Sequence, residues 1–463
     1  MSGKAGKGED MRTEKHRSLS RLALIPTLLV AVFTLSHTAF SQSPAKAGSE
    51  DQVTFAKDIA PILQRSCQNC HRPGQIGPMP LLTYENARPW ARAIKQQVVQ
   101  RNMPPWYIDR AVGVRKFKND PSLSDAEVAL ISKWVDSGAP MGNQADMPPA
   151  RKFDDSDRWH IGQPDVVVTL QHPVTVKPTD PDQWLDVQTE DPQIKMDRYI
   201  QAVEVKPISG PKVIHHAVAS MEWQDDQGGE QQSLLEEYAV GKFGDIYPSD
   251  TGRVMKAGTK FTVNLHLHAV GEETPANVAV GVKFYPAGYV PKHIEITQHT
   301  GDNEDFLIPP NTKNVRVDGY SVLLKPARLT AFQPHLHNRG QAQCLEAIYP
   351  PAQTGGRAKK ETLSCVDRYH FDWHIVYHYS DDEQPILPAG TMLHVTSWFD
   401  NTAANKFNPD PSNPVAFGQR TIDDMSFSWV SWYYLTDEEY KQMVAERVEK
   451  QKKLTSLNVP PKQ

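Results

Sequence analysis

Two groups of residues in this chain have the types and spacing of metal ligands. The first is Cys67-Gln68-Asn69-Cys70-His71, in which an imidazole directly follows the second of two thiols. This CxxCH pattern attaches a c-type haem. The second group consists of paired histidines, which suit copper or zinc: His215 with His216, His266 with His268, and His335 with His337. Haem and copper both exchange single electrons, so these residues predict a redox protein.

The haem motif predicts a role for each of its residues. Cys67 and Cys70 would form thioether bonds to haem, and His71 would be the proximal ligand of the iron. The second axial ligand should come from the loop before the last helix of this region, where Met103 is the first choice. A methionine ligand would raise the reduction potential relative to two histidines. Met79 follows His71 closely, so we expect it to pack on the haem edge instead.

The spacing of the histidines predicts which of them can chelate together. Side chains two positions apart on a strand project from one face, so His335 and His337 can bind one metal ion. The adjacent His215 and His216 point to opposite faces of an extended strand. Both can reach one metal only where the backbone bends.

Length and charge limit the class of protein. A chain of 463 residues is longer than one ordinary core needs and predicts about two to four domains. The formal charge of -5 provides no basic surface, so nucleic acid is not expected as a partner.

The N-terminal residues predict export. Basic residues precede the apolar run from Leu22 to Leu35, and Ala39-Phe40-Ser41 offers small residues to a signal peptidase, so residues 1–41 are expected to be a signal peptide. An uncleaved anchor is the alternative, but the run is short for a spanning helix. We expect a periplasmic or secreted protein without a stable membrane span after cleavage. Export is compatible with covalent haem and with a disulfide.

The region around the haem motif, residues 53–143, is expected to be helical. Thr54 can cap a helix that ends at the motif, and a second helix is expected over 85–100. Ser124-Asp125-Ala126-Glu127 forms a capping box for a last helix that Gly138 would stop. The order of helix, haem motif, methionine-containing loop and final helix resembles a small class I cytochrome c. This resemblance implies an all-α haem domain.

The remainder of the chain is expected to be β-rich. A polar, proline-rich linker covers residues 144–164. After it, short β-branched runs alternate with clusters of Gly, Pro, Asp and Asn, a pattern typical of all-β sandwiches of the jelly-roll type. Their number predicts two sandwiches, over residues 165–305 and 306–440, followed by a charged C-terminal tail over 441–463. A charged helix is expected over 437–454.

Two cysteines lie outside the haem motif. Cys344 and Cys365 flank Gly355-Gly356 almost symmetrically. A hairpin would bring them opposite each other and allow one disulfide.

The order of the histidine motifs resembles the type II copper, ascorbate-dependent monooxygenases, the family of peptidylglycine α-hydroxylating monooxygenase and dopamine β-hydroxylase. The resemblance covers roughly residues 165 to 440. Four segments carry it: Val213-Ile214-His215-His216, Val263-Asn264-Leu265-His266, Pro334-His335-Leu336-His337-Asn338-Arg339-Gly340 and Thr421-Ile422-Asp423-Asp424-Met425. The family implies one copper that transfers electrons and one that activates O₂.

This resemblance implies two sets of copper ligands. The first set would be His215, His216 and His266. The second, which is also the catalytic set, would be His335, His337 and Met425, whose thioether suits Cu(I). This chain departs from the family by having leucine where tyrosine usually follows the third histidine of the first set. His268 therefore remains an alternative to His266.

A further histidine series, His370, His374 and His378, matches no motif of the family. We expect these residues to lie on a strand surface or in the core, without forming another metal site.

Together these patterns predict an exported copper monooxygenase that inserts one atom of O₂ into a C–H bond and reduces the other to water. Electrons would pass from ascorbate or a redox protein through the haem to copper. The sequence does not identify the organic substrate. The alternative is a non-catalytic electron-transfer or metal- or ligand-binding protein that uses the same sandwiches. Metal analysis would separate the two, because zinc or no metal would support the alternative.

Overall fold

The computed structural model describes residues 52–73, 75–153, 159–239 and 242–457. The expected signal peptide lies outside these residues. Within the described ranges, the apolar side chains form three separate cores, one among short helices and two between β-sheets. None of the described helices combines the length and the apolar character that crossing a membrane requires.

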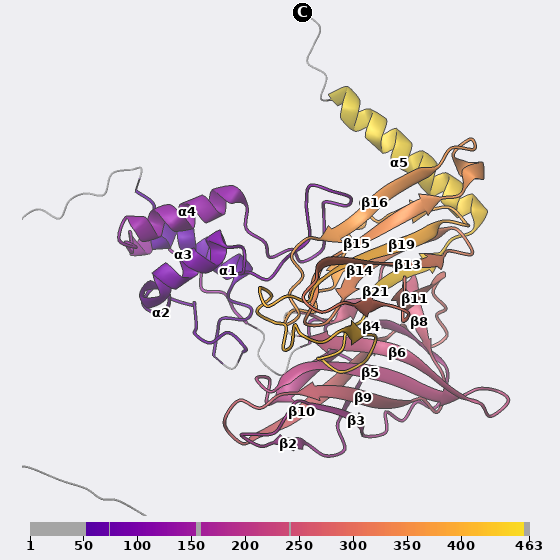
Figure 1. Cartoon of the computed structure of the whole chain (residues 1–463), viewed down its shortest axis with the longest axis horizontal. Helices are drawn as coiled ribbons and strands as arrows, with labels where there is room; N and C mark the ends of the chain where they lie inside the picture. Colours follow the sequence, from indigo (N-terminus) through magenta and orange to yellow (C-terminus); the bar gives the residue numbers. More distant parts are fainter. Residues whose placement is uncertain (1–51, 74, 154–158, 240–241, 458–463) are drawn as a thin grey trace, which may run out of the picture. The chain divides into compact units, whose positions relative to one another are not determined.

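Short helices surround the first core (Figure 1). Thr54 caps the first of them by accepting a hydrogen bond from the N–H of Lys57. The capping box between Ser124 and Glu127 is present, as predicted, at the start of the last α-helix around this core. The predicted helix over 85–100 is interrupted by a 3₁₀ turn at Pro89, because proline lacks the N–H that a continuous helix needs. The elements are η1 (Phe55–Ile59), α1 (Ala60–Ser66), α2 (Tyr84–Ala87), η2 (Arg88–Trp90), α3 (Ala91–Val99), α4 (Asp125–Asp136) and η3 (Gln144–Asp146).

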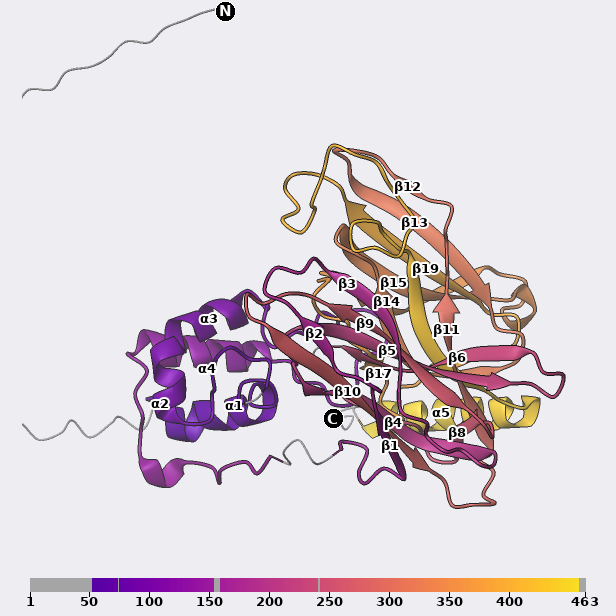
Figure 2. The ribbon, with the colours of Figure 1, turned by 90° about the horizontal axis from the view of Figure 1, so that it is seen from below.

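The second core is that of the first sandwich and lies between two layers of strands formed by residues 166–284. One sheet has the order β3-β9-β5-β6 and includes β3 (Gln183–Gln188), β9 (Lys260–Leu267), β5 (Ile214–Gln224) and β6 (Glu230–Ala239). Figure 2 shows β3, β9 and β5 side by side in this layer. The facing strands are β1 (Val166–Thr169), β10 (Thr274–Phe284), β4 (Arg198–Ser209) and β8 (Thr251–Met255), with the short β2 (Val174–Val176) and β7 (Asp245–Ile246) at their sides.

The third core belongs to the second sandwich, in which a four-stranded sheet faces another layer of strands. The sheet has the order β13-β19-β15-β16, comprising β13 (Lys313–Val322), β19 (Met392–Asp400), β15 (Gly340–Tyr349) and β16 (Lys359–Val366). The facing strands are β11 (His293–Thr300), β21 (Phe427–Tyr434), β14 (Ala327–His335), β17 (Tyr377–His378) and β18 (Ile386–Leu387). The remaining elements are the pair β12 (Leu307–Ile308) and β20 (Val415–Ala416), the turn η4 (Pro351–Gln353) and the C-terminal helix α5 (Asp437–Leu457).

A parallel contact between β8 and β11 joins one sheet of each sandwich into a continuous sheet of eleven strands. The sequence places β11 within the first sandwich (165–305). In the structure its residues from Glu295 to Thr300 pair with β21 of the second sandwich. Its first two residues, His293 and Ile294, pair with β8. The strand therefore belongs to the seam between the sandwiches.

The prediction of a β-rich chain is confirmed. The β-branched runs that predict strands lie in β1, β4, β9, β10 and β13. Val203, Val263 and Val280, one from each of three such strands, are completely buried in the second core. The predicted charged helix near the C-terminus is also present as α5.

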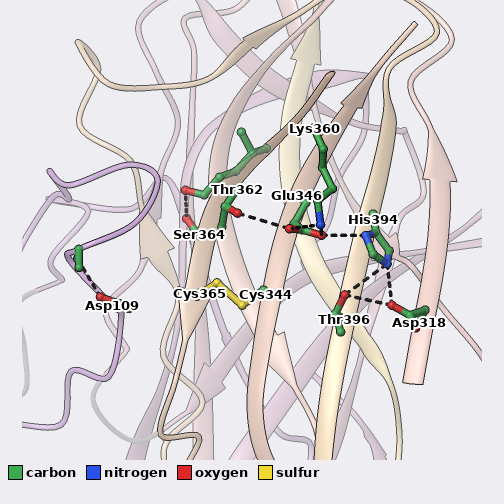
Figure 3. Close-up of a disulfide and its surroundings, with 12 residues drawn as sticks. Asp109, Asp318, Cys344, Glu346, Lys360, Thr362, Ser364, Cys365, His394 and Thr396 are labelled. Atoms are coloured by element: carbon green, nitrogen blue, oxygen red, sulfur yellow. Dashed lines mark hydrogen bonds and ion pairs between the residues drawn. A yellow bond between two sulfur atoms is a disulfide. The ribbon is translucent and has the colours of Figure 1, made fainter. Parts of the chain in front are cut away.

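The predicted disulfide joins Cys344 of β15 to Cys365 of β16 (Figure 3). The two residues are direct cross-strand neighbours, and their Cα atoms are 4.1 Å apart. A row of charged and polar groups crosses the same sheet beside it: Glu346 accepts hydrogen bonds from Lys360 and Thr362 and pairs with His394. The hairpin thus places the cysteines as the symmetric spacing around Gly355-Gly356 predicts.

The segment from Trp106 to Lys118 attaches to the second sandwich, which the sequence does not predict. Four of its apolar side chains are buried in the third core: Tyr107, Ile108, Val114 and Phe117. Along the backbone, the N–H of Asp109 donates to the carbonyl of Cys365 at 2.8 Å, and the N–H of Val114 donates to that of Leu363 at 2.9 Å. The chain between Met103 and α4 is therefore anchored on β16.

Residues of the predicted linker 144–164 also contact their neighbours. The guanidinium of Arg151 donates a hydrogen bond of 2.7 Å to the carbonyl of Gln64 in α1. Beyond the gap at 154–158, the N–H of His160 donates to the carboxylate of Glu204 at 2.7 Å. The described parts of the linker are thus fixed at both ends.

Candidate metal and haem sites

A bulge in β5 brings His215 and His216 to the same place. In the pairing of β5 with β9, Ile214 lies opposite Leu267 and His216 lies opposite His266, so His215 is the extra residue of a register shift. Such a bulge re-aims a side chain that would otherwise point to the opposite face. This is the backbone bend that two adjacent histidines need in order to share a metal ion.

His215, His216 and His266 form a compact cluster. Each can offer one ring nitrogen such that all three nitrogens lie within 4.8 Å of one another. The Nδ1 atoms of His215 and His216 are 3.2 Å apart. His215 Nε2 and His266 Nδ1 are buried without a hydrogen-bond partner. Orphaned buried nitrogens are costly in a protein interior, and a bound metal ion would satisfy them.

The electrostatics of this cluster favour neutral imidazoles, the form that binds metals. Burial, together with the nearby His374, lowers the pKa of His215 to about 2. Burial also lowers the pKa of His216 well below its usual value. The carboxylate of Asp182 lies 3.3 Å from His266 Nε2 and can orient that ring.

His268, the alternative third ligand, lies farther from this cluster. Its ring centroid is 6.3 Å from that of His215, whereas the ring of His266 is 4.9 Å away. Among the described residues, the cluster of three histidines includes His266 and excludes His268.

The second expected set is assembled at the end of a strand. His335 is the last residue of β14, and His337 lies in the turn that follows. Their ring centroids are 5.5 Å apart. Burial and the neighbouring His337 lower the pKa of His335 well below its usual value, and its Nδ1 has no hydrogen-bond partner.

A buried carboxylate ties the turn to the segment that carries Met425. Asp424 is completely buried and accepts hydrogen bonds from the N–H groups of His337, Arg339 and Met425 at 2.8, 3.1 and 3.0 Å. The pairing of β14 with β21 places His335 opposite Phe427, so Met425 precedes β21 near the level of His337. The structure therefore brings the backbones of all three expected residues together.

Arg339 and Gly340 have structural reasons to follow the second histidine pair. Arg339 is buried, and its guanidinium donates to the carbonyl of Ile422 at 2.9 Å. A Cβ atom at Gly340 would lie 2.5 Å from the side chain of Leu336. Both residues hold the turn that presents His337.

His374 is a site residue that the sequence does not predict. Its side chain is buried, as expected, but it lies between the two histidine sets and not in an isolated core. Its ring centroid is 5.5 Å from that of His215, 5.3 Å from that of His216 and 5.4 Å from that of His335. The even spacing of His370, His374 and His378 is the one sequence signal that marks it.

The residues of the haem motif line a cavity together with the predicted axial methionine. Cys67, Cys70, His71 and Met103 all contribute to the wall of this cavity, which has a volume of about 530 Å³. His71 Nδ1 lies 3.1 Å from the carbonyl oxygen of Met79, which leaves Nε2 available as a ligand. Met79 thus approaches His71 through its backbone.

Other walls of the same cavity come from the sandwiches. They include His215 of the first histidine set and His268, with Ile214, Lys212 and the loop residues Asp372 and Trp373. The haem motif and a residue of the histidine cluster therefore border one space.

The donor groups fit the expected cofactors. Two thiols, one imidazole and one thioether surround a single cavity, which is the donor set of a covalently attached haem with His and Met ligands. Gly77 supports close packing at this motif, because a Cβ atom there would lie 2.6 Å from the carbonyl oxygen of Cys70. The neutral, clustered imidazoles are the donor set of copper or zinc.

Comparisons with known proteins provide no functional assignment. No family model matches the chain, and no curated protein is similar to it in sequence. Among solved structures, a subviral particle of infectious bursal disease virus VP2 shares 8% identity at a TM-score of 0.20, covering 58% of this chain and 71% of that one. The N-terminal CBM22-1–CBM22-2 tandem domain of Paenibacillus barcinonensis Xyn10C shares 7% identity at a TM-score of 0.16, covering 59% of this chain and 98% of that one. Similarities this weak support no conclusion about function.

Proposed function

We propose that this protein is an exported monooxygenase that contains one c-type haem and two copper ions and hydroxylates a C–H bond of an organic substrate. The observation that carries the proposal is the cavity shared by Cys67, Cys70, His71 and Met103 with His215. The segment with the CxxCH pattern lies there beside a cluster of three histidines that could hold a metal ion. The order of motifs, which resembles the type II copper monooxygenases, favours copper over zinc.

The first histidine set is suited to hold an electron-transfer copper. Its three imidazoles come from two paired strands, so the protein backbone fixes their positions. Rigid ligands suit electron transfer because the coordination changes little between the two oxidation states. His215 also lines the cavity of the haem motif, which gives this set the shorter route to the proposed haem.

The second set is suited to hold the copper at which O₂ reacts. His335 and His337 are at a strand end, and the half-buried Met425 lies in the adjoining segment. A thioether favours Cu(I), the state that reacts with O₂, and copper there would supply one-electron chemistry toward O₂.

The haem would be held by thioether bonds from Cys67 and Cys70, and His71 and Met103 would be the protein ligands of its iron. The carbonyl of Met79 would fix the tautomer of His71. An external donor, ascorbate or a redox protein, would supply electrons to it. The signal peptide predicted over 1–41 and the disulfide between Cys344 and Cys365 are compatible with a periplasmic or secreted location.

The test is oxygen insertion by the full chain. Protein loaded with haem and copper would be reduced without O₂ and then exposed to isotopically labelled O₂ in the presence of exported peptides and small amines. A product that gains one labelled oxygen atom supports the proposal. Zinc in both histidine sets, or copper binding without oxygen insertion into any substrate, would favour a non-catalytic protein.

Axial ligation has a separate test. Met103→His should lower the haem reduction potential and leave the covalent attachment intact. Replacing Cys67 and Cys70 together with serine should abolish covalent attachment, which loss of haem staining after denaturing electrophoresis would reveal. An unchanged spectrum and potential in Met103→His would show that another residue is the axial ligand.

A further inference from the structure

His374 lies in the loop between β16 and β17, where its side chain is only 1% exposed. Its ring neighbours come from both sandwiches: His215 and His216 of β5 and His335 of β14. The ring of Phe371, from the same loop, packs between His215 and His337 at centroid distances of 5.3 and 5.7 Å. The loop thus inserts one imidazole and one apolar ring between the two histidine sets.

The ring nitrogens of His374 lack the partners that burial normally requires. Neither Nδ1 nor Nε2 has a hydrogen-bond partner of ordinary length and angle, although a backbone group of Phe371 approaches the ring. A buried polar group without a partner costs about 1–3 kcal/mol, so such groups mark sites where a ligand is missing. Unpartnered nitrogens also occur on two of its ring neighbours, His215 and His335. These orphaned atoms lie on adjacent rings. Among the described residues, the three histidines whose nitrogens lie within 4.8 Å of one another do not include His374, so a metal ion bound by this ring would require its loop to move toward one of the two sets.

A buried carboxylate lies close to Nδ1 of His374. An oxygen of the buried Glu237 lies 3.6 Å from His374 Nδ1. Its other oxygen accepts a hydrogen bond of 2.6 Å from the side chain of Gln333, two positions before His335 on β14. Histidines that bind metals commonly direct their other ring N–H to a carboxylate, which fixes the tautomer and raises the basicity of the ligating nitrogen. Glu237 is placed for this role.

We propose that His374 is a copper ligand located between the two sets, with Glu237 as the carboxylate that orients it. Its Nδ1–H would face Glu237, and its Nε2 would bind the metal. A neutral imidazole has one available lone pair, so His374 can bind the copper of one set at a time. The two sites therefore share one ligand, and the occupancy of one should affect the affinity of the other. The identity of the metal rests on the function proposed above.

The test is copper binding by full-length, haem-containing protein, measured without O₂ or substrate. Cu(II) would be titrated into wild type, His374→Ala, His374→Gln and Glu237→Gln, with paramagnetic resonance used to count the coordinated nitrogens. His370→Ala is the matched control, because His370 lies in the same loop but its ring neighbours are Tyr107 and Phe407. Circular dichroism would verify that each variant is folded.

We expect Glu237→Gln to weaken copper binding by about 10–100-fold, the usual effect of losing an outer-shell partner. Both His374 variants should weaken it at least as much and lose one nitrogen from the copper spectrum, while His370→Ala should behave as wild type. Wild-type affinity and nitrogen count in both folded His374 variants would overturn the proposal.

Failure of this proposal is distinguishable from failure of the proposed function. Copper ligation that depends on His374 in a chain that oxidises no substrate would overturn the monooxygenase function alone. Oxygen insertion by a chain whose copper affinity and nitrogen count do not change when His374 is replaced would overturn the present proposal alone.

Discussion

The first histidine set is fixed by paired strands, whereas the second depends on a turn and a separate segment. His216 and His266 are cross-strand neighbours, and a bulge directs His215 toward them. The ladder of backbone hydrogen bonds between β5 and β9 supports this arrangement. In the second set, His337 lies beyond the end of β14, and Met425 is joined to it through the carboxylate of Asp424.

This difference indicates which site can change its coordination. Ligands on rigid elements keep their geometry, while ligands on loops depend on the supporting contacts around them. The second set should therefore be more sensitive to changes outside its own ligands. That sensitivity would suit the O₂ chemistry proposed for the second set, and it can be tested by altering the supports of each set separately.

The largest effect is expected from Asp424→Ala. Removing this carboxylate leaves three backbone N–H groups without their acceptor, those of His337, Arg339 and Met425. At about 1–3 kcal/mol for each of the three unsatisfied groups, the free energy of unfolding should fall by at least about 3 kcal/mol. Metal analysis should show loss of the second copper and retention of the first. Urea unfolding would measure the stability.

Asp423→Ala is the matched control for this change. Its carboxylate pairs with the exposed Arg420, and its backbone carbonyl, which an alanine retains, lies 3.3 Å from His337 Nδ1. This variant should keep both coppers and nearly all of its stability. Equal copper content in the Asp424 and Asp423 variants would show that the second set is as rigid as the first.

The next effect is expected from His266→Ala, which removes a ligand of the rigid set. Copper bound by the first set should be lost, because the reduction in affinity should exceed the about 10–100-fold cost of losing an outer-shell partner. Copper at His335 and His337 should remain. His268→Ala is the control and should retain both coppers. If His268→Ala lost a copper while His266→Ala kept both, the assignment of the third ligand would be wrong.

Much of the fold follows from local patterns in the sequence. Alternation and β-branched runs predict the strands that contain Val203, Val263 and Val280, because burial on one face of a strand requires that pattern. Ser124 and Glu127 predict the start of α4, since a capping box satisfies backbone groups within four residues. The disulfide also follows from a local hairpin. The bridge between Cys344 and Cys365 needs no information from other parts of the chain.

The rest of the site depends on contacts between distant residues. The shift that re-aims His215 is a property of the register between β5 and β9, which neither strand specifies alone. His374 reaches both histidine sets because its loop is held by the segment from Trp106 to Lys118. Tyr107 stacks on His370, and the N–H of Lys118 donates to the carbonyl of His378 at 2.8 Å. Such pairings over more than two hundred residues leave no periodic signal in the sequence.

A smaller effect is expected from Gly113→Ala, which tests whether this segment supports the second set. Gly113 has a φ of +62°, and a Cβ atom there would lie 2.1 Å from the carbonyl oxygen of Leu363. The substitution should destabilise the segment by about 1–3 kcal/mol and increase hydrogen exchange at Asp109, Val114 and Lys118. Copper affinity should fall more at the second set, whose ligands lie on a turn and a separate segment, than at the first, whose ligands lie on paired strands.

Gly355→Ala separates the clash from the backbone conformation. Gly355 has a similar φ of +64°, but nothing lies within 4 Å of a Cβ atom there. This control shares the conformational cost and lacks the contact with neighbouring backbone. If both variants weakened copper binding equally, the anchored segment would have no specific role in supporting the second set.

The smallest effect is expected at the seam between the sandwiches, on which the spacing of the two sets depends. Glu295 of β11 is buried and accepts a hydrogen bond from Thr330 of β14. Burial raises its pKa to about 7. A carboxyl whose folded-state pKa is raised binds its proton more tightly in the folded chain. The free energy of unfolding should therefore fall as pH rises from the unfolded value of about 4.5 to about 7. In Glu295→Gln this part of the pH dependence should disappear, and the variant should be more stable than wild type above pH 7. Urea unfolding of both proteins across this range measures the difference.

The same variant tests whether the seam affects the metal sites. Because Glu295→Gln retains the seam, each histidine set should bind copper with the same affinity in the variant as in wild type. A change at the second set alone would show that its sensitivity extends across the seam to β11.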